Sequence, residues 1–287
     1  FILNRNINQT SIQKIDSEEI TLELGNGEII NINRYNDTII NAKKGIASIH
    51  LNNGVLRHDI ETNSNPKSQY NTLRIPKGRI LSITLQDGSV VKLNSGSELR
   101  YPSSFAGMDN RQVYLKGEAF FEITKNPKKP FVVKTEEMFT QVYGTVFNIS
   151  AYENDDKIEV VLVEGSVGVG GKNAFNAETL KMIKPFQKVT NSKVLYNTYH
   201  IEDVDVTPYI AWTKGIVAFQ NEQMSGIIKK LERQFNVKII NENEMLGELR
   251  FTGMFDKEGI DLILKTIQTH THFTYSKEGT IITIKKQ

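Results

Sequence analysis

The stretch that decides the fold reads LKGEAFFEITKNPKKPFVVKT (residues 115–135), continues as QVYGTVFNISAY (141–152) and ends as IEVVLVEGSVGV (158–169). It contains apolar runs rich in Val, Ile, Phe and Tyr, and turn sequences such as Lys-Asn-Pro and Glu-Asn-Asp-Asp separate them. This spacing is typical of short strands paired through tight turns. The runs predicted to be strands are residues 119–123, 131–133, 146–149 and 158–163.

The residues before this stretch predict further strands. Residues 20–32 alternate apolar and polar side chains around Gly25-Asn26-Gly27, which indicates a β-hairpin. The phrase ITLELGNG (20–27) returns as ITLQDG (83–88), so the chain contains an internal hairpin repeat. We expect residues 79–169 to be all-β, as a twisted roll or an irregular β-solenoid.

Two segments predict loops instead. Residues 57–77 are polar and contain proline, which favours a loop and a soft boundary inside the first domain. Residues 165–176 are rich in glycine and then polar, which favours a second loop.

The pattern changes after Gly215. Residues 224–235 and 260–267 carry apolar side chains at intervals of three and four, which predicts two amphipathic helices. With the strands between them, the predicted order is β-α-β-β-α-β-β, with both helices on one face of a sheet. We therefore expect a mainly β domain over residues 1–210 and a small α+β domain over residues 211–287.

Composition restricts the function of the chain. Its 287 residues suffice for two domains, and 35 Lys and Arg against 33 Asp and Glu give a net charge of +2. Such a balance disfavours nucleic-acid binding, which needs a strong positive field. With no cysteine, the chain has no disulfide, no zinc–thiolate site and no thiol nucleophile. The opening FILNRNINQTSI is neither a signal peptide nor a membrane span.

No polar pattern predicts catalysis, a cofactor or a metal. His270 and His272 stand close together, but no carboxylate pattern accompanies them, and a zinc site needs more converging ligands. The glycines of residues 165–171 fit neither GxGxxG nor GxxxxGK(S/T), the two spacings typical of phosphate-binding loops. Glu118 and Glu122 are expected on one face of a strand, as a strand border rather than an acid/base pair. We expect no catalytic residue for an external substrate, no cofactor and no metal.

The motifs and their order resemble a known family. The runs LQDGSVVKLNSGSELRYPSSF (85–105), VYLKGEAFFEI (113–123), VYGTVFNISAY (142–152) and VVLVEGSVGV (160–169) resemble the periplasmic domain of FecR-like anti-sigma regulators of the Bacteroidetes type. The tail, introduced by AWTKGIVAF (211–219), resembles the secretin/TonB N-terminal fold.

This resemblance implies a signalling function. The chain would be the periplasmic region of an inner-membrane anti-sigma factor, preceded by a cytoplasmic sigma-binding segment and one transmembrane helix. Its C-terminal domain would bind the signalling domain of an outer-membrane TonB-dependent transducer. The signal that the transducer has bound its ligand would then be passed to an extracytoplasmic-function sigma factor.

The resemblance also implies a candidate for self-cleavage at Gly144-Thr145. In some FecR-like proteins the Gly-Thr bond of a GTxF motif is cleaved by the domain itself, and VYGTVF (142–147) matches that motif. The Thr145 hydroxyl would attack the Gly144 carbonyl in a single N-to-O acyl shift. The structural alternative is a glycine for a tight bend followed by a strand-forming threonine.

The partner-binding candidate is the strand LRFTGMF (249–255). Alternation places Phe251 and Phe255 inward and leaves Arg250, Thr252 and Met254 outward. A partner can add a strand at an open edge, whereas a central strand would be covered.

Two other functions compete with signalling. One is a carbohydrate-binding or cell-envelope assembly module, since β rolls with exposed aromatic residues can bind glycans. The α+β tail distinguishes this module from a signalling protein, because signalling needs the tail and a lectin does not. A hydrolase is the weaker alternative, because no acid/base pair or nucleophile set supports it.

Overall fold

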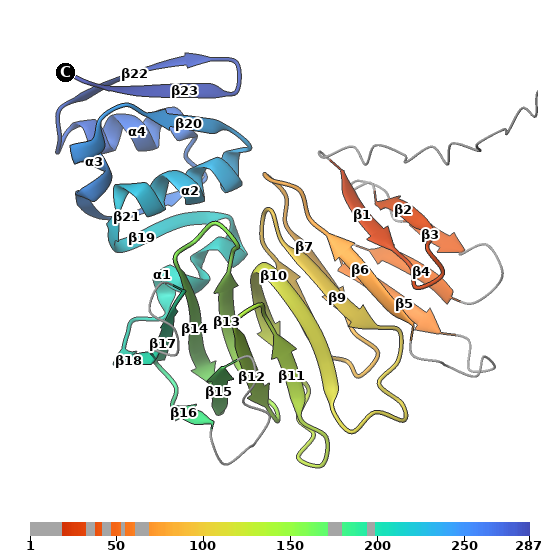
Figure 1. Cartoon of the computed structure of the whole chain (residues 1–287). Coiled ribbons are helices and arrows are strands. Elements are labelled where there is room, and N and C mark those ends of the chain that lie inside the picture. The colour runs from red at the N-terminus through yellow and green to blue at the C-terminus, as the bar shows by residue number, and fades with distance from the viewer. Residues whose placement is uncertain are drawn as a thin grey trace, which may run out of the picture.

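The computed structural model describes residues 19–32, 38–41, 47–52, 55–60, 69–171, 180–193 and 199–287. These residues form a large all-β body followed by a smaller α+β unit (Figure 1). The predicted fold class, mainly β plus α+β, is confirmed.

Two sheets make up the β body. In spatial order, the first sheet contains β2 (Ile29–Ile32), β1 (Ile20–Glu23), β6 (Tyr70–Arg74), β9 (Glu98–Pro102), β10 (Arg111–Glu122), β11 (Phe131–Lys134), β12 (Met138–Val142), β15 (Val167–Gly171) and β16 (Lys181–Ile183). The second contains β3 (Thr38–Asn41), β4 (Ala47–Asn52), β5 (Val55–Ile60), β7 (Leu81–Thr84), β8 (Val90–Leu93), β10, β13 (Val146–Ala151), β14 (Lys157–Glu164), β17 (Gln187–Ser192) and β18 (Tyr199–Asp203).

Strand β10 belongs to both sheets. Its first half pairs with β9 and β11, and its second half, from Gly117 onward, pairs with β8 and β13. Gly117 has φ +90, and a Cβ there would lie 2.7 Å from the Cα of Ser97. Only glycine fits this crossing without strain, because other residues rarely adopt a positive φ and would collide with the neighbouring backbone.

The buried faces of the two sheets form one hydrophobic core that extends from Ile20 to Val189. Alternate residues of β10 point inward, as period-2 geometry requires. The ring of Phe121 stacks on Phe147 with centroids 4.9 Å apart and meets Phe131 edge-on at 6.4 Å. The segment 115–169 therefore supplies the aromatic centre of this core.

The repeated hairpin is present in both copies. Strands β1 and β2 pair around Gly27, with φ +84, and strands β7 and β8 pair around Gly88, with φ +81. The two copies lie in different sheets, so the repeat contributes one hairpin to each layer.

Other expectations need correction. The predicted loop at residues 57–77 contains the end of β5 and all of β6, and these strands pair with β7 and β1. Residues 61–68 of this segment lie outside the described residues, and Leu56 and Leu73 on either side belong to the same hydrophobic core. Part of the glycine-rich segment 165–176 is strand β15, which pairs with β12 and β16, whereas residues 172–179 lie outside the described residues. Strands β10 and β11 pair in parallel, not as a hairpin.

The α+β unit follows a short helical linker. The linker consists of α1 (Thr207–Ile210) and the 3-10 turn η2 (Ala211–Lys214). The unit itself contains β19 (Ile216–Gln223), α2 (Met224–Phe235), β20 (Lys238–Asn241), α3 (Glu244–Glu248), β21 (Arg250–Asp256), α4 (Ile260–Gln268), β22 (Phe273–Glu278) and β23 (Ile281–Lys286). Both predicted amphipathic helices, α2 and α4, are present.

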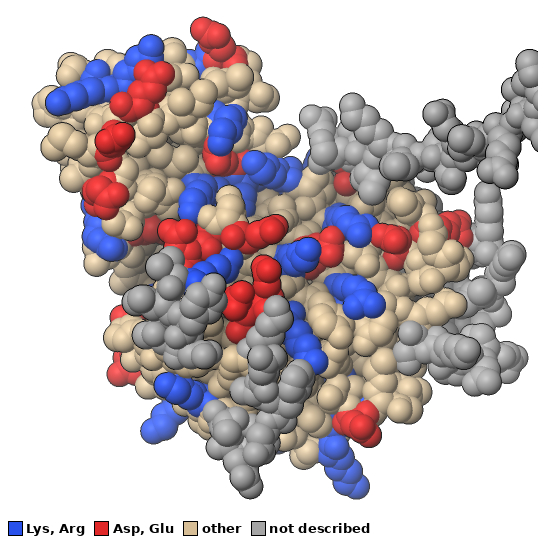
Figure 2. All heavy atoms as spheres, in the orientation of Figure 1, with Lys and Arg blue, Asp and Glu red and all other residues tan. Residues whose placement is uncertain are grey.

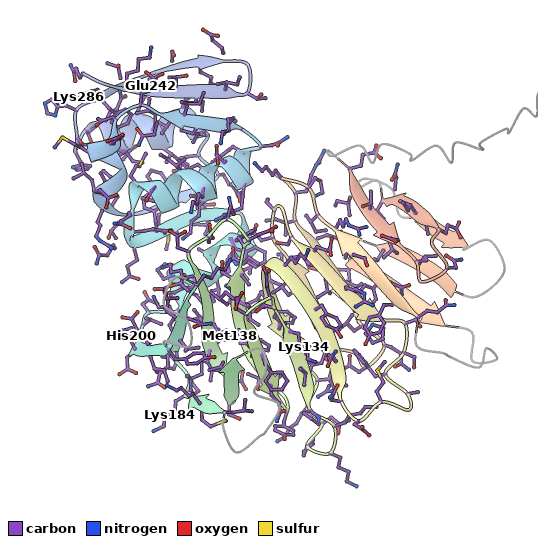
Figure 3. The ribbon with its side chains drawn as sticks, in the orientation of Figure 1. Lys134, Met138, Lys184, His200, Glu242 and Lys286 are labelled. Atoms are coloured by element: carbon purple, nitrogen blue, oxygen red, sulfur yellow. The ribbon has the colours of Figure 1, made fainter. Side chains whose placement is uncertain are left out.

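The arrangement of this unit differs from the prediction in two respects. The short helix α3 was missed, and the strands form two sheets, β19–β21 and β20–β23–β22. Figure 1 shows α2 and α4 between these sheets, so the helices do not lie on one face of a single sheet. The apolar stripes fill a second hydrophobic core, from Val217 to Ile284, which shares no residue with the first. Glu242 and Lys286 lie on the side away from the β body (Figure 3).

Candidate functional site

A cavity of about 70 Å³, lined by both charged and apolar side chains, lies where the α+β unit meets the β body. Both parts line it, and the charged and aromatic residues of its wall include Glu118, Glu159, Trp212, Lys230 and Arg233. Figure 2 shows acidic and basic side chains interspersed at this junction.

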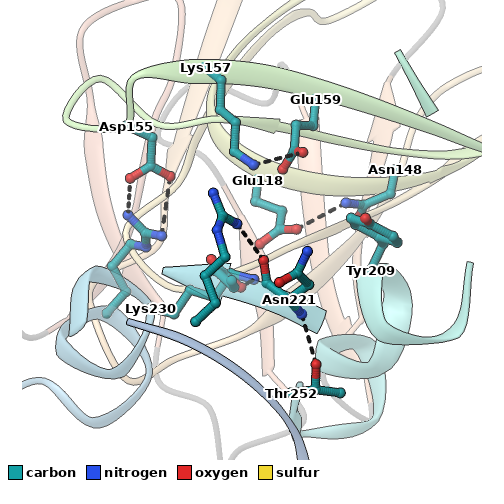
Figure 4. A network of polar contacts seen from close by, with 12 residues as sticks. Glu118, Asn148, Asp155, Lys157, Glu159, Tyr209, Asn221, Lys230 and Thr252 are labelled. Atoms are coloured by element: carbon teal, nitrogen blue, oxygen red, sulfur yellow. Dashed lines mark hydrogen bonds and ion pairs between the residues drawn. The ribbon is translucent and has the colours of Figure 1, made fainter. Parts of the chain in front are cut away.

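Glu118 of β10 is one of the carboxylates that line the cavity. Its carboxylate accepts hydrogen bonds from Asn94 Nδ2 at 2.8 Å and Asn148 Nδ2 at 2.9 Å. Figure 4 shows the bond between Asn148 and Glu118. The Asn148 Oδ1 in turn accepts from the indole Nε1 of Trp212 at 3.2 Å. Burial raises the pKa of Glu118, and the two amide hydrogen bonds oppose part of the rise. A hydrogen-bonded chain therefore connects the β body to the linker.

A second carboxylate of the wall, Glu159, is held by lysines. The Nζ of Lys188 lies 3.1 Å from Glu159, 3.0 Å from Glu202 and 3.0 Å from the hydroxyl of Tyr209. Burial alone would lower the pKa of Lys188, but the Glu159 carboxylate beside it raises that pKa well above its usual value. Burial likewise opposes ionisation of Glu159, yet Lys157 and Lys188 hold its pKa below the usual value.

The remaining charges of the wall are also paired. Lys230 Nζ lies 2.6 Å from Glu222 Oε2, and Arg233 is bound to Asp155. Each charged side chain of the cavity wall therefore has a partner within the chain, and of these pairs the one between Arg233 and Asp155 joins the two parts. Sequence reasoning missed this junction; the one signal for it was Trp212, the single tryptophan of the chain.

Gly144 and Thr145 lie on the β body, between β12 and β13. The Thr145 side chain is buried, and its hydroxyl donates to the Ser166 carbonyl at 3.0 Å. A Cβ on Gly144 would lie 2.7 Å from the Cα of Lys125, so close backbone approach demands glycine here. The flanking carbonyls of Tyr143 and Thr145 accept from the amides of Asn126 and Ile123 at 2.7 and 3.0 Å. The packing supplies a structural reason for the Gly-Thr pair.

Strand β21 pairs only with β19 among the described strands. Arg250, Thr252 and Met254 are exposed, while Phe251 and Phe255 pack against the second core, so exposure follows the predicted alternation. Two of the outward side chains also make contacts within the chain. Arg250 Nη1 donates to the Asn221 carbonyl at 2.6 Å, and Thr252 Oγ1 accepts from the Asn221 amide at 2.9 Å (Figure 4).

Those contacts stabilise an irregularity that sequence reasoning did not foresee. The β19–β21 register shifts between Phe219 and Glu222, and Asn221 has φ +46. Arg250 and Thr252 are therefore both bonded to Asn221 of the bulge. The third outward side chain of β21, Met254, is apolar and 52 % exposed.

The remaining polar candidates stay dispersed. His270 and His272 are exposed in the turn after α4. Within the described ranges, no group of three or more His, Cys, Asp or Glu side chains is arranged to hold a metal ion. No helix among those residues has the length and apolar character needed to cross a membrane.

Comparison with known proteins identifies both parts of the chain. Residues 71–168 match the family model described as FecR protein, and residues 216–284 match the one described as FecR, C-terminal. Two crystal structures, each of a candidate anti-sigma factor from Parabacteroides distasonis ATCC 8503, have TM-scores of 0.70 with this chain. They are 28% and 29% identical to it, and the matches cover 76% and 75% of this chain and 99% of each of those chains.

The chain is a FecR-like protein. The comparisons support an anti-sigma regulatory role, and a sigma factor is the general partner that such a role implies. No curated protein matches the chain. The likeness of the FecR C-terminal part to the secretin/TonB N-terminal fold stays a prediction.

Proposed function

We propose that this FecR-like chain is the periplasmic signalling region of an inner-membrane anti-sigma regulator. In this proposal, the α+β unit binds the signalling domain of an outer-membrane TonB-dependent transducer. The β body relays occupancy of the transducer towards an extracytoplasmic-function sigma factor. The observation that supports the proposal best is the unpaired outer edge of β21.

An unpaired strand edge offers main-chain donors and acceptors to an incoming strand, and the outward side chains supply specificity. The edge of β20 is closed by comparison, because the Ile239 amide donates to the buried Glu232 carboxylate at 2.8 Å. Strand β22 also has only one partner among the described strands. Its last residues, Lys277 and Glu278, are charged and exposed, which discourages strand addition. Met254 distinguishes the edge of β21, since its apolar side chain can be covered by a partner.

Binding of the transducer's signalling domain tests the proposal. The probe is the N-terminal signalling domain of a TonB-dependent transducer from the same organism, titrated calorimetrically into the protein. We expect Met254→Lys to weaken binding about tenfold, or ~1.4 kcal/mol, by placing a charge in the contact. Ser276→Lys, an exposed position on β22, is the matched control and should bind like wild type. Wild-type affinity in Met254→Lys, or loss of binding in Ser276→Lys alone, would reject the β21 edge.

We also propose that Gly144-Thr145 undergoes one self-cleavage per chain, with no turnover of an external substrate. The Thr145 oxygen would bond to the Gly144 carbonyl carbon, the peptide C–N bond would break, and the freed amine would take the hydroxyl proton. Water would then hydrolyse the ester to give residues 1–144 and 145–287. The buried Thr145 hydroxyl, held against the Ser166 carbonyl beside this bond, supports the proposal.

Intact-mass measurement tests self-cleavage. Wild type and Thr145→Ser should give two fragments after incubation, because both carry a hydroxyl, whereas Thr145→Ala should remain one species. A single full-length species in all three proteins would refute it.

A further inference from the structure

One arginine holds the α+β unit against the β body. The Arg233 side chain of α2 is 10 % exposed, and its two terminal nitrogens lie 3.0 and 3.3 Å from the carboxylate oxygens of Asp155. Its guanidinium carbon lies 3.8 Å from the ring centroid of Tyr152, and its carbonyl accepts from the Gly78 amide at 2.8 Å. Arg233 therefore joins two separate turns of the β body to one helix.

Further hydrogen bonds cross this junction. Lys229 Nζ donates to the Asn154 carbonyl at 2.6 Å, and Lys92 Nζ donates to the Thr213 carbonyl. The Trp212 indole binds Asn148, and Trp212 belongs to neither hydrophobic core. The junction thus combines polar contacts with a few apolar side chains, such as Val161 and Ala218, and belongs to neither hydrophobic core as a whole.

Charge is complementary across the junction. Helix α2 presents Lys229 and Arg233, one turn apart, to the turn Glu153-Asn154-Asp155-Asp156. The adjacent cavity of about 70 Å³ is large enough to hold water, since a cavity needs about 10–15 Å³ to admit one molecule. Contacts between domains that rest largely on polar groups resemble transient interfaces, which separate and re-form.

We propose that this junction is a reversible latch, closed mainly by Arg233, that opens without unfolding either part. Each part keeps its own hydrophobic core when the latch opens, because the two cores share no residue. Opening uncovers the basic face of α2 and the acidic turn of residues 153–156, and it moves Trp212 from 7 % exposure into water. The inference does not depend on binding of a transducer.

Trp212 makes the latch measurable, because it is the one tryptophan in the 287 residues. We expect Arg233→Ala to shift the tryptophan emission to longer wavelength and to raise the acrylamide quenching constant about threefold, with an unchanged far-ultraviolet circular dichroism spectrum. Lys285→Ala removes a cation of the same unit that pairs with Glu242 outside the junction, and it should match wild type. Asp155→Asn removes the charge of the partner but keeps its size, and it should reproduce the effect of Arg233→Ala. It therefore tests the latch even if Arg233→Ala fails to fold.

Urea supplies the second readout. In wild type, the Trp212 emission change should precede the loss of circular dichroism, and 1 M salt should move it to lower urea, since salt screens the ion pair. The latch is refuted if the folded Arg233→Ala and Asp155→Asn proteins both keep wild-type emission and quenching. It is equally refuted if the two urea transitions coincide in wild type.

Discussion

Substitution of Gly117 by alanine is expected to destabilise the β body by about 2–5 kcal/mol. Gly117 is the point at which β10 passes from one sheet to the other, and its φ of +90 favours glycine. The added methyl group would lie 2.7 Å from Ser97 Cα and 2.5 Å from Ser97 Oγ. The hydroxyl can rotate away, but the backbone atom cannot move without shifting β9.

The magnitude has two parts. A non-glycine residue in a left-handed conformation costs about 1–2 kcal/mol. Forcing a methyl group into a packed space costs about 1–3 kcal/mol. A shift of Ser97 would also disturb the bonds that its hydroxyl makes with the amide and carbonyl of Glu118, at 2.8 and 3.0 Å. Against a typical stability of about 5–15 kcal/mol, the loss would be large.

Urea unfolding followed by far-ultraviolet circular dichroism measures the loss of stability. The variant Gly107→Ala separates the cost of backbone strain from the cost of the collision. Gly107 has φ +73, and a methyl group added there would meet no atom within 4 Å, so its substitution carries the strain without the collision. We expect Gly107→Ala to cost about 1–2 kcal/mol and Gly117→Ala clearly more. Equal losses in the two variants would show that the contact with Ser97 does not constrain the crossing.

Three further predictions test other parts of the fold. Phe186→Gly should raise the free energy of unfolding by about 0.5–1 kcal/mol in urea titration, because Phe186 is 59 % exposed and has φ +65; a loss of stability would contradict this. Glu232→Ala should cost about 1–3 kcal/mol by leaving the Ile239 amide without its acceptor, whereas the exposed Glu242→Ala should stay within about 0.5 kcal/mol of wild type. The folded-state pKa of Glu118 is raised, so its contribution to stability is complete below the pKa of the unfolded chain and is lost as pH rises through the folded-state pKa. Unfolding from pH 4 to 8 should show this decline in wild type and not in Glu118→Gln; parallel profiles would argue against a raised pKa.

Local pattern predicted those elements whose structure depends on near neighbours. The hairpin around Gly27 and its copy around Gly88 follow from alternation and turn residues, both of which act within about ten residues. The helices α2 and α4 follow from apolar spacing in the same way. The order of motifs also identified the family, although no motif revealed a catalytic centre.

Long-range pairing could not be read from the sequence. The parallel contact of β10 with β11 and the strand made by the glycines of Val167–Gly171 depend on partners brought together by the whole fold. The junction at Arg233 was missed for the same reason, since Arg233 and Asp155 are 78 residues apart. A charged residue on an amphipathic helix is usually solvated, and only the packed structure shows its partner.

By itself, the sequence determined the β-rich character, the change to an α+β tail and the exposure of alternate residues on β21, because these depend on side-chain periodicity along a short piece of backbone. Tertiary structure alone decided which strands lie side by side, that β10 serves both sheets and that a polar junction separates two cores. These features depend on contacts between residues far apart in the chain, whose energies are balanced only once both surfaces are in place.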